Sequence, residues 1–117
     1  MQSLNCRGRL LDLSTPVIMG ILNLTPDSFY DGGRLTTVDD ALRQAENMLS
    51  AGAAILDIGG ASTRPGATEV AETEEIRRVL PAIAAIIKRF PETILSIDTW
   101  RAAVAREALD AGASLIN

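Results

Sequence analysis

Polar side chains stand at the carboxyl end of four apolar runs, and these residues are the best placed to do chemistry together. They are Asn23, Asp57, Asp98 and Asn117. Their amide and carboxylate oxygens accept hydrogen bonds. A single Asp or Asn in such a place is commonly a turn residue or a helix cap, whereas four in succession favour a shared binding site. The binding site requires that the four runs be neighbouring parallel strands, whose carboxyl ends meet at one edge.

The composition excludes several other chemistries. The 117 residues include no histidine and a single cysteine, Cys6, so the usual zinc sites, Ser-His and Cys-His pairs and internal disulfides have no raw material. A net charge of -4 argues against a nucleic-acid partner. No apolar run approaches the roughly 20 residues that span a bilayer, and the N-terminus does not resemble a secretory leader. We therefore expect a cytoplasmic protein without a membrane partner.

The same four apolar runs predict the strands that would carry the polar side chains. They lie at residues 17–23, 54–58, 93–97 and 114–117. Helical periodicity fills the three intervals between them, and alternation of strands with helices is typical of a parallel sheet in the α/β class. Residues 4–13 alternate around Arg7 and Gly8, which predicts a hairpin that plugs or caps the fold.

Three helices are expected between the strands. Thr37 is a plausible N-cap for the first helix and Gly52 its natural stop. Pro81 should kink or divide the second helix, because proline removes a backbone donor. Thr99 is expected to cap the third, which runs to about Ala111. One apolar face of the second helix would carry Ile76, Leu80, Ile83 and Ile87.

Two short segments of the sequence resemble each other and predict corresponding positions in two strands. Residues 51–57 match residues 111–117 as a helix end, a glycine turn and a strand. The match predicts that Asn117 occupies the place in its strand that Asp57 occupies in the earlier one. Seven residues are too few to indicate a duplicated ancestor, since any two such units look alike locally.

Two long segments resemble the signatures of one enzyme family. Residues 17–33 are similar to the first signature of the dihydropteroate synthases, and residues 52–66 are similar to the second. Residues 96–99 and the terminal Asn117 continue the resemblance in family order. One departure is Ala61, which stands where many members have glutamate.

The resemblance implies a fold. Members are expected to form a parallel (β/α)₈ barrel of TIM type with about 250 residues. Residues 1–117 would then be a single partial domain, the N-terminal half of a pterin-binding barrel. Further pterin and diphosphate ligands, which the family takes from its later strands, would lie outside this half.

The resemblance also implies a function. The family displaces diphosphate from a pterin methylene with the amine of p-aminobenzoate, so these small molecules would be the partners. Asn23 resembles a residue whose amide oxygen binds Mg²⁺, a hard cation that bridges phosphates. Asp98 and Asn117 resemble two pterin ligands. We expect Asp98 to accept from the ring N–H that becomes more acidic as positive charge develops on the pterin.

Residues of the two long loops complete the implied site. Thr63 resembles a residue that contacts the pterin substrate. Arg64 could pair with the departing diphosphate or with Asp31 of the other loop, although composition alone describes both as solvated loop charges. With Asp98 they are the expected catalytic residues, while Asp57 would orient loop backbone beside the site. A wall around p-aminobenzoate is implied for Phe29, Ser62 and Pro65.

Two other functions stay open. A pterin-binding methyltransferase module shares the fold and the pterin pocket, but it has no need for the loops at residues 25–29 and 62–65. An inactive fragment is the second alternative, because half a barrel has open strand edges and an uncovered apolar interior. We expect such a chain to be a homodimer or to self-associate, and to make no product without the missing half.

Overall fold

The computed structural model describes residues 3–24, 38–61 and 70–117. In this part of the chain four strands form a parallel sheet in the order β3-β4-β5-β6. The strands are β3 (Met19–Asn23), β4 (Ile55–Gly59), β5 (Ile94–Ile97) and β6 (Leu115–Ile116). Strand order in space follows strand order in sequence, which confirms the expected α/β arrangement. Each strand end therefore lies beside the next one along the chain.

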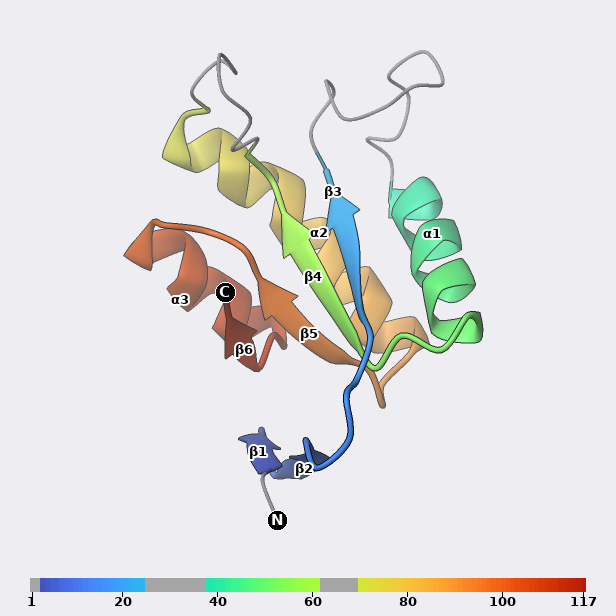
Figure 1. Cartoon of the computed structure of the whole chain (residues 1–117). Coiled ribbons are helices and arrows are strands. Elements are labelled where there is room, and N and C mark those ends of the chain that lie inside the picture. The colour runs from blue at the N-terminus through green and yellow to red at the C-terminus, as the bar shows by residue number, and fades with distance from the viewer. Residues whose placement is uncertain (1–2, 25–37, 62–69) are drawn as a thin grey trace.

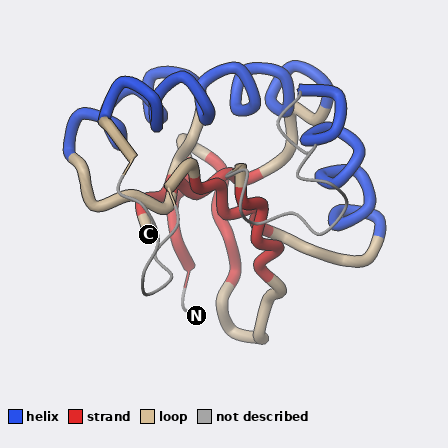
Figure 2. The backbone as a smooth tube through the Cα atoms, turned by 90° about the horizontal axis from the view of Figure 1, so that it is seen from above, coloured by secondary structure: helices blue, strands red, loops and turns tan. Residues whose placement is uncertain are grey.

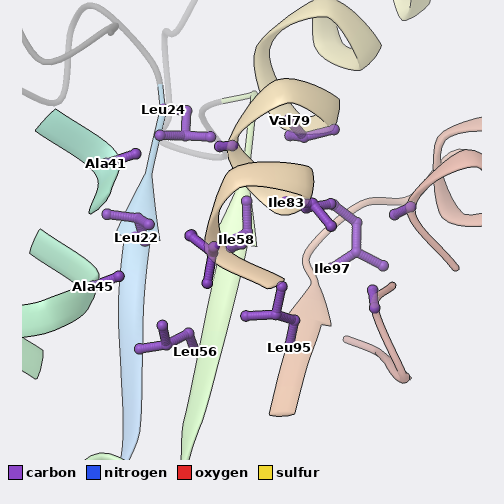
Figure 3. Close-up of a cluster of buried hydrophobic side chains, with 14 of the residues drawn as sticks. Leu22, Leu24, Ala41, Ala45, Leu56, Ile58, Val79, Ile83, Leu95 and Ile97 are labelled. Atoms are coloured by element: carbon purple, nitrogen blue, oxygen red, sulfur yellow. The ribbon is translucent and has the colours of Figure 1, made fainter. Parts of the chain in front are cut away.

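The helices between the strands cover one face of the sheet (Figures 1 and 2). They are α1 (Val38–Ser50), α2 (Glu72–Arg89) and α3 (Ala102–Ala111). Every second strand residue points toward them, so Leu22, Ile58 and Ile97 are fully buried in the shared core (Figure 3). The alternate residues face the other side, where Met19 and Ile21 are 39% and 52% exposed. The helices thus cover one face of the described sheet, and the other face is exposed along β3.

An N-terminal hairpin lies below the amino ends of the strands (Figure 1). Strand β1 (Ser3–Cys6) pairs with β2 (Arg9–Asp12) in antiparallel register. The turn between them has φ of 57° at Arg7 and 85° at Gly8, and two successive left-handed residues match the twist of a two-residue hairpin. Cys6 and Leu11 form a small apolar cluster with Ile55 and Ile94. The hairpin therefore plugs the amino end of the sheet, as the sequence predicted.

The second helix is continuous, so of the kink or division expected at Pro81 the division does not occur. Helix α2 runs through that residue for 18 residues (Figure 1). Proline leaves the carbonyl of Arg77 without its helical donor, but both residues are exposed and water can replace the missing partner.

The buried face of α2 is also shifted from the one predicted. Ile76, Leu80 and Ile87 are only partly buried. The helix packs against both α1 and α3 as well as the sheet, so periodicity alone did not show which part of its broad apolar stripe faces the sheet. The fully buried residues are Glu75, Val79, Ala82, Ile83 and Ile86.

Helix α1 ends where the sequence predicted, whereas the N-cap of α3 is a different residue. Helix α1 stops at Ser50, and Gly52 follows with a φ of 108° that favours glycine. The expected cap Thr37 lies outside the described residues. Thr99 is not the N-cap of α3, because that position belongs to Arg101. The Thr99 hydroxyl instead accepts the Arg101 N–H at 3.2 Å and is occupied by a second partner on α2.

Candidate binding site at the carboxyl ends of the strands

Polar residues from neighbouring strands meet at one rim of the sheet. Asn23 is the last residue of β3 and pairs in register with Gly59. The Asp98 N–H donates to the Ile58 carbonyl at 2.8 Å, which places Asp98 beside the end of β4. The Asn117 N–H donates to the Ile97 carbonyl at 2.8 Å, which places Asn117 beside the end of β5. The structure thus brings three of the predicted side chains to the carboxyl edge, as parallel strands require.

Gly59 separates Asn23 from Asp98 without placing a side chain between them. A Cβ atom at Gly59 would lie 3.6 Å from the Asp98 Cβ and 3.7 Å from the Asn23 Oδ1. The floor of the rim at this point is therefore bare backbone. Such a floor allows a flat ligand to approach the strand ends closely.

Asp57 and Asn117 are joined across the intervening strand. Asp57 pairs in register with Ser96, whereas Asn117 follows Ile116, the partner of Ile97. Asn117 thus lies two residues nearer the carboxyl edge than Asp57. Each nevertheless stands two residues after the start of its own strand, Ile55 for β4 and Leu115 for β6, so the correspondence predicted from residues 51–57 and 111–117 is confirmed. Strands of barrel-type sheets are staggered, and equal places along two strands are not level in space. The side chains still meet, because the Asn117 Nδ2 donates to the Asp57 Oδ2 at 3.1 Å.

In the described part of the chain, the rim has more hydrogen-bond acceptors than donors. Asp57 is only 2% exposed, and its Oδ1 has no hydrogen-bond partner in the described part of the chain. The pKa of Asp98 is raised above the ordinary aspartate value, first by burial and then by the negative charges of Asp57 and Glu75. A ligand that offers several N–H groups or positive charge would therefore relieve this excess.

Glu75 is a buried member of this cluster that the sequence analysis missed. It is 1% exposed, and its carboxylate accepts from the Thr99 hydroxyl at 2.7 Å and from the Arg101 Nη1 at 2.9 Å. Glu75 is one of three acidic residues in the first turn of α2, where acidic side chains commonly interact with the helix dipole. The sequence therefore did not distinguish it from the other two. The signal that could have found Glu75 is its spacing, since it falls four residues before Val79 and eight before Ile83 on the buried stripe.

The predicted loop residues lie outside the described residues. They are Phe29, Asp31, Ser62, Thr63, Arg64 and Pro65. Their segments leave the described chain after Leu24 and Ala61, directly beyond the ends of β3 and β4. Their connection to the rim follows from the topology, whereas their roles stay predictions.

The described residues hold no group of three or more His, Cys, Asp or Glu side chains arranged for a metal ion. A cation held mainly by substrate phosphates and water needs only one or two protein oxygens, however. The amide oxygen of the exposed Asn23 at the end of β3 fits that modest requirement. None of the described helices has the length and apolar character that a membrane span requires.

Together these features define a class of protein: a parallel β/α sheet that carries a ligand site at its carboxyl edge, as in (β/α) barrels. The family model described as "Pterin binding enzyme" matches residues 19–117. The chain belongs to this pterin-binding enzyme family.

Two curated relatives are dihydropteroate synthases. The chain is 52% identical over 111 residues to the dihydropteroate synthase of Escherichia coli (strain K12), covering 95% of this chain and 39% of the relative. It is 53% identical over 114 residues to that of Haemophilus influenzae, covering 97% and 41%. The chain therefore spans about two fifths of the length of these two relatives.

Solved structures agree. The Yersinia pestis dihydropteroate synthase, in a sulfonamide drug complex, superposes with a TM-score of 0.92 at 57% identity, covering 99% of this chain and 42% of that one. The Xanthomonas albilineans enzyme with 4-aminobenzoic acid gives a TM-score of 0.89 at 50% identity, covering 98% and 42%. The resemblance found in the sequence is thus confirmed, and the four-stranded sheet matches part of a TIM-type barrel.

Proposed function

We propose that the natural protein carrying these residues is a dihydropteroate synthase of folate biosynthesis. It would condense (7,8-dihydropterin-6-yl)methyl diphosphate with p-aminobenzoate to give 7,8-dihydropteroate and diphosphate. A C–N bond forms to the methylene carbon, the C–O bond to diphosphate breaks, and the amine loses a proton. The observation that carries the proposal is the excess of acceptor oxygens at the rim, contributed by Asp57, Asp98 and Asn117.

The acceptor excess suits a pterin because the edge of that ring offers several N–H donors in one plane. Asp98 and Asn117, which stand at neighbouring strand ends, would accept from this edge. The charge of Asp98, with Asp57 and Glu75 nearby, would stabilise positive charge that develops on the ring as diphosphate departs. The interaction is stronger in the transition state than in the ground state, which is the requirement for catalysis.

The departing diphosphate needs positive charge from another source. Asn23 would hold Mg²⁺ at the end of β3, and the ion would supply charge neutralisation to the phosphates. Arg64 would pair with the diphosphate or with Asp31, and Thr63 would contact the pterin. Asp57 would orient neighbouring groups through its bond to Asn117. The wall around p-aminobenzoate would consist of Phe29, Ser62 and Pro65.

The synthase is preferred to a pterin-binding methyltransferase module because the curated relatives named above are synthases. For the isolated 117-residue chain we propose self-association without synthesis. Strand β3 exposes Met19 and Ile21 on the face without helices, and β3 and β6 are the edges of the described sheet. Sedimentation of the isolated chain tests this proposal, and a stable monomer would contradict it.

The function is tested with Asp98→Asn in the natural protein that carries this sequence. We expect turnover to fall about a hundredfold or more, because the substitution removes a charge aimed at the developing cation. Dihydropteroate formation by the wild type and the variant is the measurement. The matched control is Asp110→Asn, which removes an exposed carboxylate at the far end of α3. Turnover of Asp98→Asn equal to that of the control would refute the role.

A further inference from the structure

We propose that Glu75 is a positioning residue that fixes Asp98 at the rim through Thr99 and Arg101. The inference rests on the proposed function, because it names a further residue on which pterin recognition depends. Nothing in the signatures assigns a role to Glu75, which lies on a helix behind the sheet. Its carboxylate nevertheless contacts the two residues that govern how the chain leaves β5.

The contacts give each oxygen of the Glu75 carboxylate its own donor. The Thr99 hydroxyl donates to Oε2 at 2.7 Å, and the Arg101 Nη1 donates to Oε1 at 2.9 Å. The Arg101 guanidinium also lies over the Trp100 ring, 4.4 Å from its centroid. Two of the three residues that follow Asp98 are thereby bonded to α2. Because Thr99 is the next residue along the chain, its anchoring restricts the backbone that orients the Asp98 side chain.

Stability alone does not account for a carboxylate in this place. Glu75 is fully buried on a stripe that continues with Val79 and Ile83. Burying a carboxylate and an arginine carries a large desolvation cost, and apolar replacements of buried ion pairs are often neutral or stabilising. An ion pair with fixed hydrogen-bond geometry instead selects one conformation among several. We attribute the retained charge to this selection.

The same helix also holds the exit of the neighbouring strand. Arg78, one turn after Glu75, donates its Nη1 to the Gly60 carbonyl at 2.9 Å. Gly60 packs so closely that a Cβ there would lie 2.9 Å from the Val79 Cγ1. The first turns of α2 therefore fix the chain just beyond Gly59 and just beyond Asp98. Helix α2 therefore sets the position of the Gly59 backbone relative to the Asp98 carboxylate.

The decisive variants are Thr99→Val and Thr99→Ser. Valine removes the hydroxyl while keeping the size and charge of the site, whereas serine retains the hydroxyl. In the natural protein we expect Thr99→Val to weaken binding of the pterin diphosphate about tenfold and to lower kcat about tenfold, because small misplacements of reacting groups are costly. The KM for p-aminobenzoate should change less than about twofold. Thr99→Ser should restore most of both losses.

A double-mutant cycle links the effect to Glu75. Glu75→Gln leaves one amide oxygen to accept hydrogen bonds, so it cannot receive both donors as the carboxylate does. If Thr99 acts through Glu75, adding Thr99→Val to Glu75→Gln should cause little further loss of pterin affinity. If the two substitutions instead lower pterin affinity independently, so that their effects multiply in the double variant, Thr99 does not act through Glu75.

A measurement that needs no activity separates this inference from the proposed function. The Asp98 N–H donates to the Ile58 carbonyl, a bond that Thr99→Val does not touch. Its hydrogen exchange should nevertheless accelerate at least about tenfold if Thr99 anchors Asp98. The control is Ile86→Val, which weakens packing elsewhere on α2 and should leave the Asp98 amide relatively unchanged.

Each outcome has a defined meaning. Faster exchange at Asp98 in Thr99→Val alone supports the positioning role. Unchanged exchange, or the same acceleration in Ile86→Val, overturns it. If the natural protein makes no dihydropteroate, the proposed function fails, and the exchange of the Asp98 amide still decides whether Glu75 and Thr99 position this carboxylate.

Discussion

The two ends of the sheet use the same strands for different purposes. At the amino end, Ile55 and Ile94 pack against the hairpin in an apolar cluster. Toward the carboxyl end of the same face, Asp57 follows on β4 and Asp98 follows β5. Only a few strand residues therefore separate the apolar cluster under the hairpin from the acidic residues of the rim. The amino end is built for stability, and the carboxyl end carries groups that stability alone would not favour.

The largest expected effect comes from breaking the amino-end plug. Ile94→Ala should lower the free energy of unfolding by about 2–4 kcal/mol, because it leaves a cavity under the hairpin. Urea denaturation of the natural protein is the measurement. Pterin affinity of the remaining folded protein should stay close to that of the wild type. A selective loss of pterin binding without loss of stability would show that the two ends are not separate.

A smaller effect is expected where the hairpin is fastened to a helix end. The Arg7 Nη1 donates to the Leu109 carbonyl at 2.9 Å in the last turn of α3. Arg7→Ala should cost about 1 kcal/mol, since it removes this bond and a positive charge at the helix carboxyl end. Lys88→Ala, which removes an exposed positive charge from α2, is the control for net charge in the same denaturation experiment.

At the carboxyl rim, the stability of the fold should depend on pH through Asp98. The pKa of Asp98 is raised in the folded state by burial, Asp57 and Glu75. The native state therefore holds this proton longer than the unfolded state does. Its contribution to stability declines as the pH rises from the ordinary value of 3.8 through the raised pKa, and is constant above it.

Asp98→Asn tests that dependence. The variant lacks the repulsion from Asp57 and Glu75, so it should be slightly more stable than the wild type at neutral pH, by less than about 1 kcal/mol. The difference should vanish at pH values below the ordinary aspartate pKa. Denaturation series at several pH values provide the measurement. A variant that is less stable at neutral pH would mean that the charge stabilises the fold.

The smallest effect is expected at an exposed ion pair outside both ends. Arg77 and Arg78 lower the pKa of Glu74 to about 2 through hydrogen bonds to its carboxylate. Arg77→Ala should move that pKa back toward its ordinary value of 4.5, as followed by carboxyl NMR titration. Global stability at neutral pH should stay within error of the wild type, because exposed pairs contribute little. The pterin site should not respond.

Much of the site could be predicted because it depends on local sequence. Apolar runs ended by Asn23, Asp98 and Asn117 indicate strand ends, and strands that alternate with helices place such ends on one edge. Glycine after Arg7 indicated the hairpin turn in the same way. Glu75 was missed because its partners Thr99 and Arg101 are 24 and 26 residues away along the chain. No local pattern records which acidic residue of a helix turn faces inward.

The amino-acid sequence by itself determined the alternation of strands and helices, the hairpin and the identity of the polar residues at the strand ends. Backbone preferences and the burial of apolar residues act over a few neighbours, so a linear pattern contains them. Only the tertiary structure decided the stagger that separates Asp57 from Asn117, the continuity of α2 through Pro81, and the burial of Glu75. These depend on packing between elements distant in sequence, where the stagger of the strands and the orientation of a helix are set jointly.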